Sequence, residues 1–363
     1  MKILKIIKTI AVFVIGMITN TVFCFSLPSD WNVQAGSADI QINENQMTIT
    51  TSDPATIVNF NSFDVNQNES VVICLPSDDA RFLSRVTGGS QTEILGSIDC
   101  NGTFVLVNEA GIHVGTTGQI NAANVILSTR DITNDNFVSG NYVFARMSKE
   151  TMDRLLVNEG KITVKEGGFG VLIAGGIDNK GVVIAPMGRI ALASGDGVRV
   201  QMSGDGLISV AMDMKTAEKI VDIDGNPITT QITNSGTLES TQVVLDAESV
   251  PDVFETAINL NGVVKSTRME TDTESGSVNM IGTENVEINA EIEAYSVDVK
   301  SEKDVTVDSD ITANGGDIKL QADSDNDGEG EFTQNAEVIE ATGEGDVYID
   351  GSGDMTLKTV KVE

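Results

Sequence analysis

Short runs of Val, Ile and Thr, separated by Gly, Asn and Asp, recur along almost the whole chain, and this repetition constrains the fold more than any other feature. Some runs alternate with polar residues and others are filled with aliphatic residues, while helical periodicity is nearly absent. The runs include residues 71–75, 104–107, 124–129, 161–166, 170–175, 189–194, 199–203, 296–301 and 304–309. The chain is therefore predicted to be mostly β.

A loose internal repeat accompanies these runs: a turn residue, Gly, any residue or none, and then an aliphatic residue. It occurs at residues 117–120, 159–162, 180–183, 187–190, 235–238 and 261–264. Gly160 and Gly181 are 21 residues apart, and Gly236 and Gly262 are 26 residues apart. This spacing favours a solenoid whose coils take roughly 20 to 25 residues each and stack into long parallel sheets with an aliphatic interior.

A pair of β-sandwiches is the alternative all-β architecture, because it also uses many short strands with frequent turns. The scarcity of Pro, Tyr and Trp argues against it, as does the shortage of Asn-Gly and Asp-Gly turns that join two matched strands into a hairpin. One segment, residues 147–160, departs from the β pattern. Ser148 precedes Met152, Leu155 and Leu156 on one helical face, which predicts a short helix outside the sheets.

The first 26 residues have the pattern of a cleavable signal peptide. Three lysines precede an apolar run from Ile10 to Ile18, and Cys24 and Ser26 follow at the spacing that a signal peptidase reads. The apolar run is shorter than the roughly 20 residues that a membrane-spanning helix needs. We therefore expect residues 1–26 to direct the chain into the periplasm and to be removed there.

The chain is strongly acidic, with a formal net charge of −31. The expected leader carries three lysines and no acidic residue, so its removal makes the remainder more acidic. This negative charge therefore argues against nucleic acid as a partner. Residues 251–363 contain 27 acidic and 7 basic residues, a composition typical of a solvated surface and compatible with calcium binding.

Two features raise the question of cross-links and metals. Cys74 and Cys100 remain after removal of the leader, and they form either a disulfide, worth about 3 kcal/mol in an oxidising compartment, or two free thiols. Residues 322–332 place acidic side chains as in the first half of an EF-hand loop, but Gln334 replaces the bidentate Glu. The candidate calcium ligands are Asp323, Asp325, Asp327 and Glu331. An acidic turn without metal is the alternative.

No set of residues predicts catalysis, and no organic cofactor is expected. His113 is the only histidine, and no activated nucleophile lies near it in the sequence. Parallel β-helices host polysaccharide lyases and glycosidases, so a secreted carbohydrate-active enzyme is the alternative class. The sparse basic residues of the second half argue against it.

Several motifs occur in a fixed order after the leader. They are "LPSDWNVQAGSADI" (27–40), "NFNSFDV" (59–65), "RFLSRVTGG" (81–89) and "ILGSIDCNGTFVLVNEAGIHVGTTGQINAANVILSTRDI" (94–132). This series resembles the amino-terminal secretion domain of filamentous-haemagglutinin-like exoproteins of two-partner secretion systems. The motif positions are Asn59, Ser62, Phe63, Arg85, Val86 and Gly88.

The resemblance implies a right-handed parallel β-helix with an amino-terminal capping and secretion region. It also implies export through an outer-membrane β-barrel transporter whose periplasmic domains recognise the amino-terminal domain. We therefore expect a secretion domain over residues 27–200, sufficient for export, and continuing acidic coils over residues 201–363. Family members act as adhesins, haemagglutinins, cytolysins or toxin carriers. An adhesin is favoured because residues 354–363 still have a strand pattern; the receptor stays unidentified.

One turn carries the family's secretion motif, Asn-Pro-Asn-Gly followed by Ile or Val. Asn108, Gly111 and Ile112 match it, whereas Glu109 and Ala110 replace the central Pro and Asn. Loss of those two residues is expected to loosen the turn while Gly111 still provides the positive φ. The family's second motif, Asn-Pro-Asn-Leu, is absent.

Overall fold

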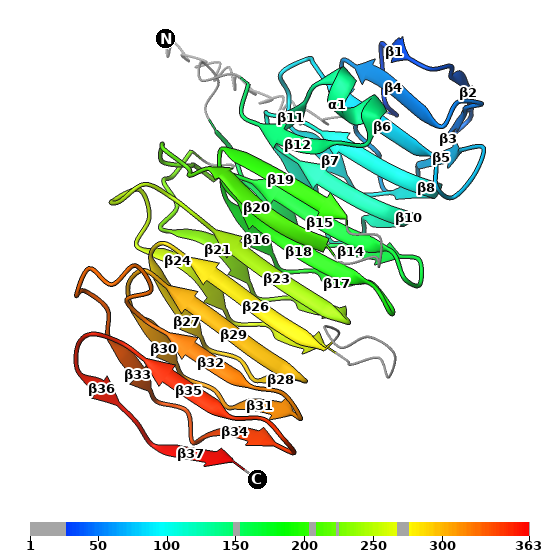
Figure 1. Ribbon diagram of the computed structural model, residues 1–363. Coiled ribbons are helices and arrows are strands. Elements are labelled where there is room, and N and C mark those ends of the chain that lie inside the picture. The colour runs from blue at the N-terminus through cyan, green and yellow to red at the C-terminus, as the bar shows by residue number, and fades with distance from the viewer. Residues whose placement is uncertain (1–26, 148–152, 203–207, 223–224, 267–275, 363) are drawn as a thin grey trace, which may run out of the picture.

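The computed structural model describes residues 27–147, 153–202, 208–222, 225–266 and 276–362, and the chain winds there into a stack of coils (Figure 1). Most coils contribute one strand to each of three faces, and neighbouring coils pair in parallel. The predicted parallel β-helix is thus confirmed. The expected signal peptide, residues 1–26, lies outside the described residues.

The three faces are listed here by their strands. Face 1 consists of β3 (Gln46–Thr50), β5 (Ser70–Cys74), the first halves of β8 (Ser97–Val107) and β10 (Gln119–Ser128), β14 (Lys161–Val164), β17 (Val182–Ile184), β22 (Thr237–Ser240), β25 (Val263–Ser266), β28 (Ile292–Ala294), β31 (Ile311–Asn314), β34 (Val338–Thr342) and β37 (Thr359–Val362). Face 2 consists of β4 (Ala55–Phe60), β6 (Arg81–Val86), the second halves of β8 and β10, β15 (Phe169–Ala174), β18 (Arg189–Ser194), β23 (Gln242–Ala247), β26 (Ser277–Gly282), β29 (Ser296–Ser301), β32 (Ile318–Gln321) and β35 (Val347–Asp350). Face 3 consists of β7 (Thr92–Ile94), β9 (Ile112–Val114), β13 (Leu156–Asn158), β16 (Ile177–Asn179), β21 (Thr230–Asn234), β24 (Thr256–Leu260), β27 (Asn285–Ile288), β30 (Val305–Val307), β33 (Phe332–Gln334) and β36 (Met355–Thr356).

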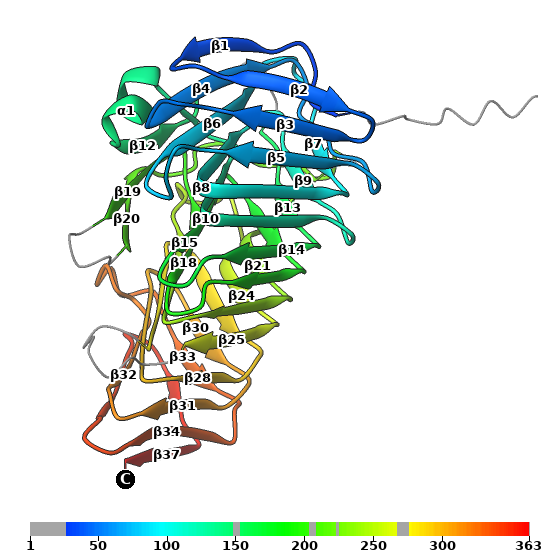
Figure 2. The same ribbon diagram turned by 90° about the vertical axis from the view of Figure 1, so that its right-hand side faces the viewer.

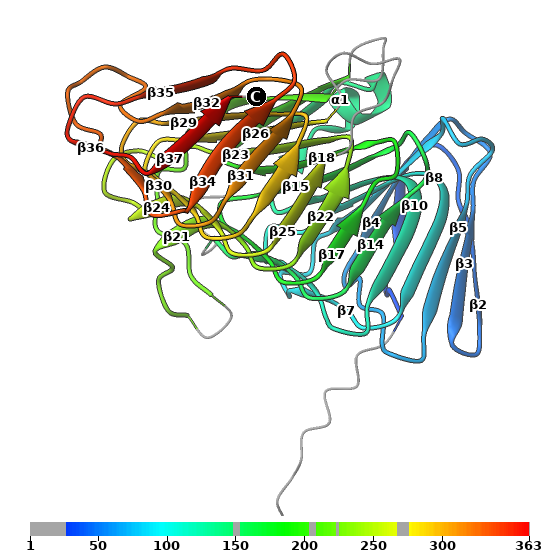
Figure 3. The same cartoon turned by 90° about the horizontal axis from the view of Figure 1, so that it is seen from below.

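Aliphatic side chains lie over aliphatic side chains inside the stack. Figures 2 and 3 show the strands of face 1 lying side by side along it. One inward column of face 1 is in register over nine coils and is almost fully buried: Ile98, Ile120, Ile162, Val183, Leu238, Val264, Ile292, Ile311 and Ile339. Burying one such side chain contributes about 1.5 to 3 kcal/mol. Since no coil covers its own apolar side, each coil depends on its neighbours for its stability.

The glycines of the internal repeat form two columns at the corners of the stack. In one column Gly118, Gly160, Gly181, Gly236 and Gly262 follow each other, and a side chain on any of the last four would collide with the backbone of the preceding coil. Gly168 and Gly188 form the second column. Gly181 and Gly236 are neighbours although 55 residues separate them, because that coil carries the additional strands described next.

A second, antiparallel sheet covers the outer side of face 2 near the amino-terminal end. It contains β11 (Asp131–Ile132), β12 (Tyr142–Ala145), β19 (Gly197–Met202) and β20 (Ile208–Met214), with helix α1 (Asn134–Ser139) beside it. Figure 2 shows this cover sheet and α1 standing off one side of the stack. At the same end, β1 (Asn32–Ala35) pairs antiparallel with β4, and β2 (Asp39–Asn43) pairs antiparallel with β3. These antiparallel strands form the expected amino-terminal cap.

The outward side chains of face 2 change from apolar to polar where the cover sheet ends. One outward column is in register from Ile57 to Tyr348. Its apolar members pack in a second hydrophobic core beneath the cover sheet: Ile57, Leu83, Val105, Ile126, Val171, Ala191 and Val244. The same column continues beyond the cover as Asn279, Asp298, Lys319 and Tyr348. Side-chain polarity therefore changes where face 2 becomes open to solvent.

The predicted helix over residues 147–160 is wrong for its described part. Residues 156–158 form β13, which lies between β9 and β16, and Leu156 is buried in the stack. Residues 148–152 lie outside the described residues. The observed helix, α1, begins after the N-cap Thr133, whose side chain accepts a hydrogen bond from the Asn136 N–H, and ends at Gly140 with φ 72°.

Helix α1 has six residues, and no helix within the described ranges is long and apolar enough to cross a membrane. The boundary expected at residue 200 falls inside β19, whose partner β20 extends to Met214.

Candidate functional site

The 108–112 turn closes between the end of β8 and the start of β9. Asn108 is buried, and its side chain organises the turn: Nδ2 donates to the Ser90 carbonyl and to Thr92 Oγ1, both at 2.9 Å. Oδ1 accepts from the Ala110 N–H at 2.9 Å. The Asn108 carbonyl also accepts from the Gly111 N–H at 3.1 Å. One asparagine thus fixes both the shape of the turn and its contact with the preceding coil.

Gly111 has a φ of 109°, a backbone conformation that glycine adopts readily and other residues disfavour. The next coil also lies close, because an added Cβ would be 3.4 Å from the Arg154 Cβ and from the Leu155 carbonyl oxygen. Ile112 follows as the first residue of β9 and is fully buried. Gly111 and Ile112 therefore have structural roles that match their positions in the motif.

The two positions that depart from the motif make contacts of their own. Glu109 Oε1 accepts a hydrogen bond from the Met147 N–H at 2.9 Å. This contact ties the turn to the chain that leaves β12 of the cover sheet. The turn is therefore held from outside as well as by Asn108, which compensates in part for the absent proline.

The second group of motif residues lies in the two coils before the turn. Asn59 and Arg85 are paired in register on face 2. Phe63 is fully buried with its ring 5.1 Å from that of Phe60, and Val86 is buried as well. The Ser62 and Ser29 hydroxyls share a hydrogen bond of 2.8 Å, and a side chain at Gly88 would collide with the Asn61 carbonyl.

Arg85 joins these coils to the cover. Its guanidinium donates to Asp131 Oδ1 at 2.8 Å, to Asn134 Oδ1 at 2.9 Å, to Asn59 Oδ1 at 3.2 Å and to the Ile132 carbonyl at 2.5 Å. These acceptors come from β4, β11 and the start of α1. Arg85 is therefore a positioning residue that fixes the cover against face 2.

The two motif groups meet at one cleft of about 470 Å³, which we call the turn cleft. It is lined by Arg85, Val86, Thr87, Gly89, Val107, Asn108, Glu109, Ala110, Asp131 and Arg154. Arg154 is half-buried, and its one hydrogen bond within the described residues is a long one of 3.4 Å to the Asp222 carbonyl. It forms no ion pair with any described residue. The cleft thus contains a cation that has no carboxylate partner among the described residues of an acidic protein.

His113 lies one residue beyond the turn on the outer side of face 3. When protonated, it donates from Nδ1 to Glu93 Oε2 at 2.9 Å and from Nε2 to Glu159 Oε2 at 3.3 Å. The hydrogen bond to Glu93 raises the pKa of His113, and Glu159 acts in the same direction while burial opposes them. Both ring nitrogens are engaged, so the histidine serves as a cross-coil link.

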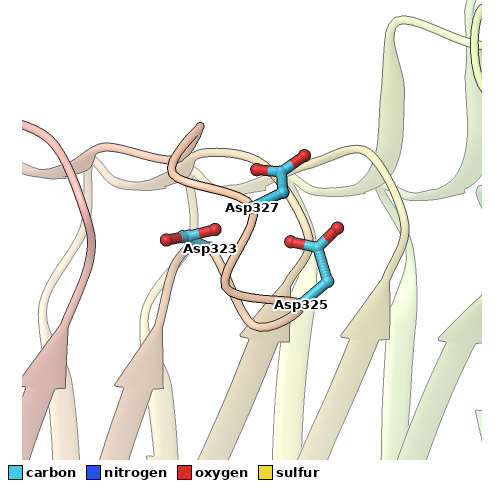
Figure 4. A group of neighbouring side chains, drawn as sticks. All are labelled: Asp323, Asp325 and Asp327. Atoms are coloured by element: carbon cyan, nitrogen blue, oxygen red, sulfur yellow. The ribbon is translucent and has the colours of Figure 1, made fainter.

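The acidic loop between β32 and β33 gathers three of the four predicted calcium ligands. Carboxylate oxygens of Asp323, Asp325 and Asp327 lie within 4.8 Å of one another (Figure 4). Glu331 lies outside this group, and its N–H donates to Asp304 Oδ1. Lys303 Nζ lies 3.4 Å from Asp327 Oδ2 and 3.0 Å from Glu329 Oε2 and neutralises part of the charge.

The two cysteines are free thiols in the structure, as in the second of the two alternatives. Ile73 lies opposite Cys100 in the register of β5 and β8, so Cys74 comes one position later and points to the other side of the sheet. Cys74 is exposed and Cys100 is buried. Burial raises the pKa of the Cys100 thiol to about 12, so this thiol stays protonated.

Buried ion pairs that no sequence motif predicted hold the cover sheet in place. Arg130 donates to both carboxylate oxygens of Asp153, at 2.8 and 2.7 Å, and to Asp196 Oδ1 at 3.0 Å. Arg130 Nε also donates to the Gly195 carbonyl at 2.8 Å. The partners are 23 and 66 residues away, beyond the reach of any local motif.

Comparison with known proteins connects this architecture to export. The model of the TPS secretion domain family matches residues 26–287. Two heme/hemopexin-binding proteins of Haemophilus influenzae are similar in sequence: one is 30% identical over 204 residues, which are 55% of this chain and 22% of the relative, and the other is 26% identical over 269 residues, which are 68% and 27%. The matches thus span about a quarter of the length of these relatives.

A solved structure has the same fold. The secretion domain of HMW1 from Haemophilus influenzae superposes with a TM-score of 0.56 at 20% identity, covering 93% of this chain and 100% of the solved one. The predicted resemblance and its β-helical architecture are therefore confirmed.

Proposed function

Because the chain belongs to the family of TPS (two-partner secretion) domains, we propose that a dedicated outer-membrane β-barrel transporter exports it and recognises it at the turn cleft. The expected signal peptide brings the chain to the periplasm and is cleaved there. The transporter's periplasmic domains then bind the amino-terminal coils, and the protein reaches the cell surface or the medium.

The observation that carries this proposal is the convergence of separate motifs on one cleft. Arg85 and Val86 come from β6, Asn108 comes from the end of β8, and Arg154 comes from the following coil. Structural requirements alone explain Arg85 and Asn108, which are saturated with internal hydrogen bonds. They do not explain Arg154, which forms no ion pair with any residue that the structure describes.

The charge of this protein predicts which chemical group of the transporter makes the contact. A protein with a net charge of −31 repels an acidic partner over most of its surface, so an arginine that forms no ion pair with any described residue is where such a partner gains affinity and orientation. We therefore propose that a carboxylate of the transporter's periplasmic domain pairs with Arg154, while the surface of the 108–112 turn supplies the shape.

A binding titration tests this proposal with the full chain after removal of residues 1–26 and the purified periplasmic domains of the cognate transporter. Arg154→Glu is expected to weaken binding at least tenfold, because one charge-assisted contact becomes a repulsion. Arg199→Glu is the matched control, since Arg199 is an arginine of the cover sheet paired with Asp213 at 3.0 Å. A fragment that ends at residue 200 would lack β20, which makes the full chain the better material.

Unchanged affinity of Arg154→Glu, or an equal loss in the Arg199→Glu control, would contradict recognition at the turn cleft. Asn108→Ala addresses the turn separately. It is expected to reduce binding while leaving the far coils folded, because it removes three hydrogen bonds that shape the turn.

After export, we propose that the protein acts as an adhesin or haemagglutinin. The stack offers a long regular surface, and face 2 becomes polar and open beyond the cover sheet. Agglutination of erythrocytes and attachment of coated beads to epithelial cells test this role. Membrane lysis in the same assays would favour a cytolysin, and digestion of polysaccharides would favour the alternative of a carbohydrate-active enzyme.

The names of the two curated relatives suggest haem and hemopexin as ligands, but one observation disfavours haem ligation by histidine in this chain. His113 is its only histidine, and both ring nitrogens face glutamates. An axial ligand needs a free imidazole nitrogen. Absence of a haem absorption shift on titration would agree with the adhesin proposal.

A further inference from the structure

From the open part of face 2, we infer that this protein carries a binding groove for an extended neutral oligosaccharide. The inference rests on the proposed adhesin role and names the class of its receptor. The groove lies on the outer side of β26, β29, β32 and β35, which Figure 1 shows side by side beyond β20 toward the carboxy-terminal end.

Two adjoining hollows of about 760 and 440 Å³ form the groove, and they share Asp298 and Lys319. Its floor follows the outward column from Asn279 to Tyr348 across four strands in register. With about 4.8 Å between neighbouring strands, the floor is roughly 14 Å long. This length suits a chain of sugar units better than a single sugar.

An exposed aromatic ring lies at one end of the groove. Tyr348 is 52% exposed, yet its position is fixed from two sides. The Lys319 ammonium lies 5.7 Å from its ring centroid, and its hydroxyl donates to Asp346 Oδ2 at 3.2 Å. A ring that is held in place before binding loses little entropy when a sugar ring stacks on it.

The second hollow is lined by another tyrosine, Tyr295. Gly315 and Gly316 lie against the Tyr295 ring, and added side chains would come within 2.8 and 2.9 Å of it. The two glycines therefore make room for the Tyr295 ring at this end of the groove. Asp317 and Glu344 form the rim of the same hollow.

The two hollows are also lined by polar and charged side chains. Asn279 and Gln321 present amides, and Asp298 and Lys300 present charges. Asp298 Oδ1 is buried and accepts no hydrogen bond from the described residues. The rest of the Asp298 side chain is 37% exposed, and its accessible oxygen can accept from a sugar hydroxyl. Amides, carboxylates and ammonium groups beside aromatic rings are the groups that bind the hydroxyls and apolar faces of sugars.

Charge selects neutral sugars over anionic ones. Five carboxylates line the groove or flank its tyrosine: Asp298, Asp317, Glu344, Asp346 and Asp350. Two lysines oppose them, Lys300 and Lys319, and both are paired with acidic side chains. A sialylated or uronic chain would therefore be repelled.

The test uses the full chain without residues 1–26 on an array of neutral tri- to hexasaccharides of glucose, galactose, mannose and N-acetylglucosamine, with sialylated counterparts. We expect binding of at least one neutral series and weaker binding of its sialylated form. Tyr348→Ala is expected to raise the Kd of the bound oligosaccharide about tenfold, while Tyr348→Phe keeps most of the affinity. Asp298→Asn is expected to weaken binding as well.

Trp31→Ala is the matched control, because Trp31 is another exposed aromatic residue, 40% exposed, at the opposite end of the stack. Binding of no neutral oligosaccharide would overturn the inference, as would equal losses for Tyr348→Ala and Trp31→Ala. Release of reducing ends from a bound oligosaccharide would also overturn it, since the groove would then be an active site. Attachment to cells without any oligosaccharide binding would contradict this inference but would still support the adhesin proposal.

Discussion

Replacing Gly181 by alanine tests whether the coils approach as closely as the glycine columns indicate. An added Cβ at this position would lie 2.7 Å from the Glu159 carbonyl carbon and 2.8 Å from the Gly160 nitrogen, and closer still to the Gly160 carbonyl oxygen. Real Cβ atoms essentially never show such distances to backbone, and no flexible side chain is present that could move away. The two coils must therefore separate locally.

The expected cost follows from what that separation breaks. The Gly160 carbonyl accepts from the Val182 N–H at 2.9 Å, and the Gly181 N–H donates to the Asn158 carbonyl at 2.8 Å. Overpacking of a close-packed interior costs about 1 to 3 kcal/mol, and loosening a backbone hydrogen bond adds about 1 kcal/mol. We expect Gly181→Ala to destabilise this part of the stack by about 3 kcal/mol.

Hydrogen exchange read by mass spectrometry is the appropriate assay, because a stack of repeats need not unfold in one step. Exchange over residues 156–190 is expected to accelerate in Gly181→Ala. Gly170→Ala is the matched control in β15, since its Cβ would be 3.5 Å from Val164 Cγ2 and Val183 Cγ1, an ordinary contact. Equal exchange in Gly181→Ala and the wild type would refute the reasoning.

Three further predictions concern charged groups. Burial raises the pKa of Asp246, which is 3% exposed, to about 7, and Glu248 adds to the effect. The folded state thus keeps a proton that the unfolded state loses near pH 4, so the free energy of unfolding falls as the pH rises from about 4 to 7. Asp246→Asn is expected to flatten this dependence of the unfolding free energy on pH in denaturation curves. Arg130→Met removes the bidentate partner of Asp153 and a partner of Asp196, leaves Asp153 the longer contact of 3.9 Å with Arg146 Nε, and is expected to cost about 3 to 5 kcal/mol. Replacing Arg130, Asp153 and Asp196 together by apolar residues is expected to recover part of this loss; equal losses in urea titrations would contradict this. We also expect calcium to bind Asp323, Asp325 and Asp327 weakly, so that calorimetry at millimolar calcium shows heat that Asp325→Asn abolishes and Glu331→Gln keeps; no heat with the wild type would end the calcium hypothesis.

The sequence predicted the fold through features that are local and repeated. The Gly-aliphatic repeat recurs because each coil meets its neighbour in the same way, and Gly160, Gly181, Gly236 and Gly262 do stack in one column. No repeated sequence pattern predicted the cover sheet. Its strands pair antiparallel across long separations, as β12 does with β19, and its apolar residues resemble those of the coils.

The failed helix over residues 147–160 has the same origin. Met152, Leu155 and Leu156 are spaced in the sequence as in an amphipathic helix. Leu156 is nevertheless buried by pairing with strands 44 residues before and 21 residues after it, at Ile112 and Ile177. Tertiary pairing decides the structure of such short apolar runs.

The candidate site was predictable in part. The motif comparison selected Asn108 and Gly111, and the structure gives each a local reason, a side chain that caps the turn and a positive φ. Arg154 was not predictable, because it reaches the cleft only when the next coil is laid against Gly111. The groove on face 2 likewise depends on the register that aligns Asp298, Lys319 and Tyr348.

The distance between spin labels at Glu239 and Glu340 tests the stacked coils most directly. These outward positions of face 1 are 101 residues apart in sequence but belong to one column, through Lys265, Glu293 and Thr312. Four strand-to-strand steps of about 4.8 Å predict a separation of roughly 19 Å between their backbones. A narrow distribution near this value is the expected result of pulsed electron paramagnetic resonance. A broad distribution, or one centred at a much larger distance, would contradict a parallel stack in register.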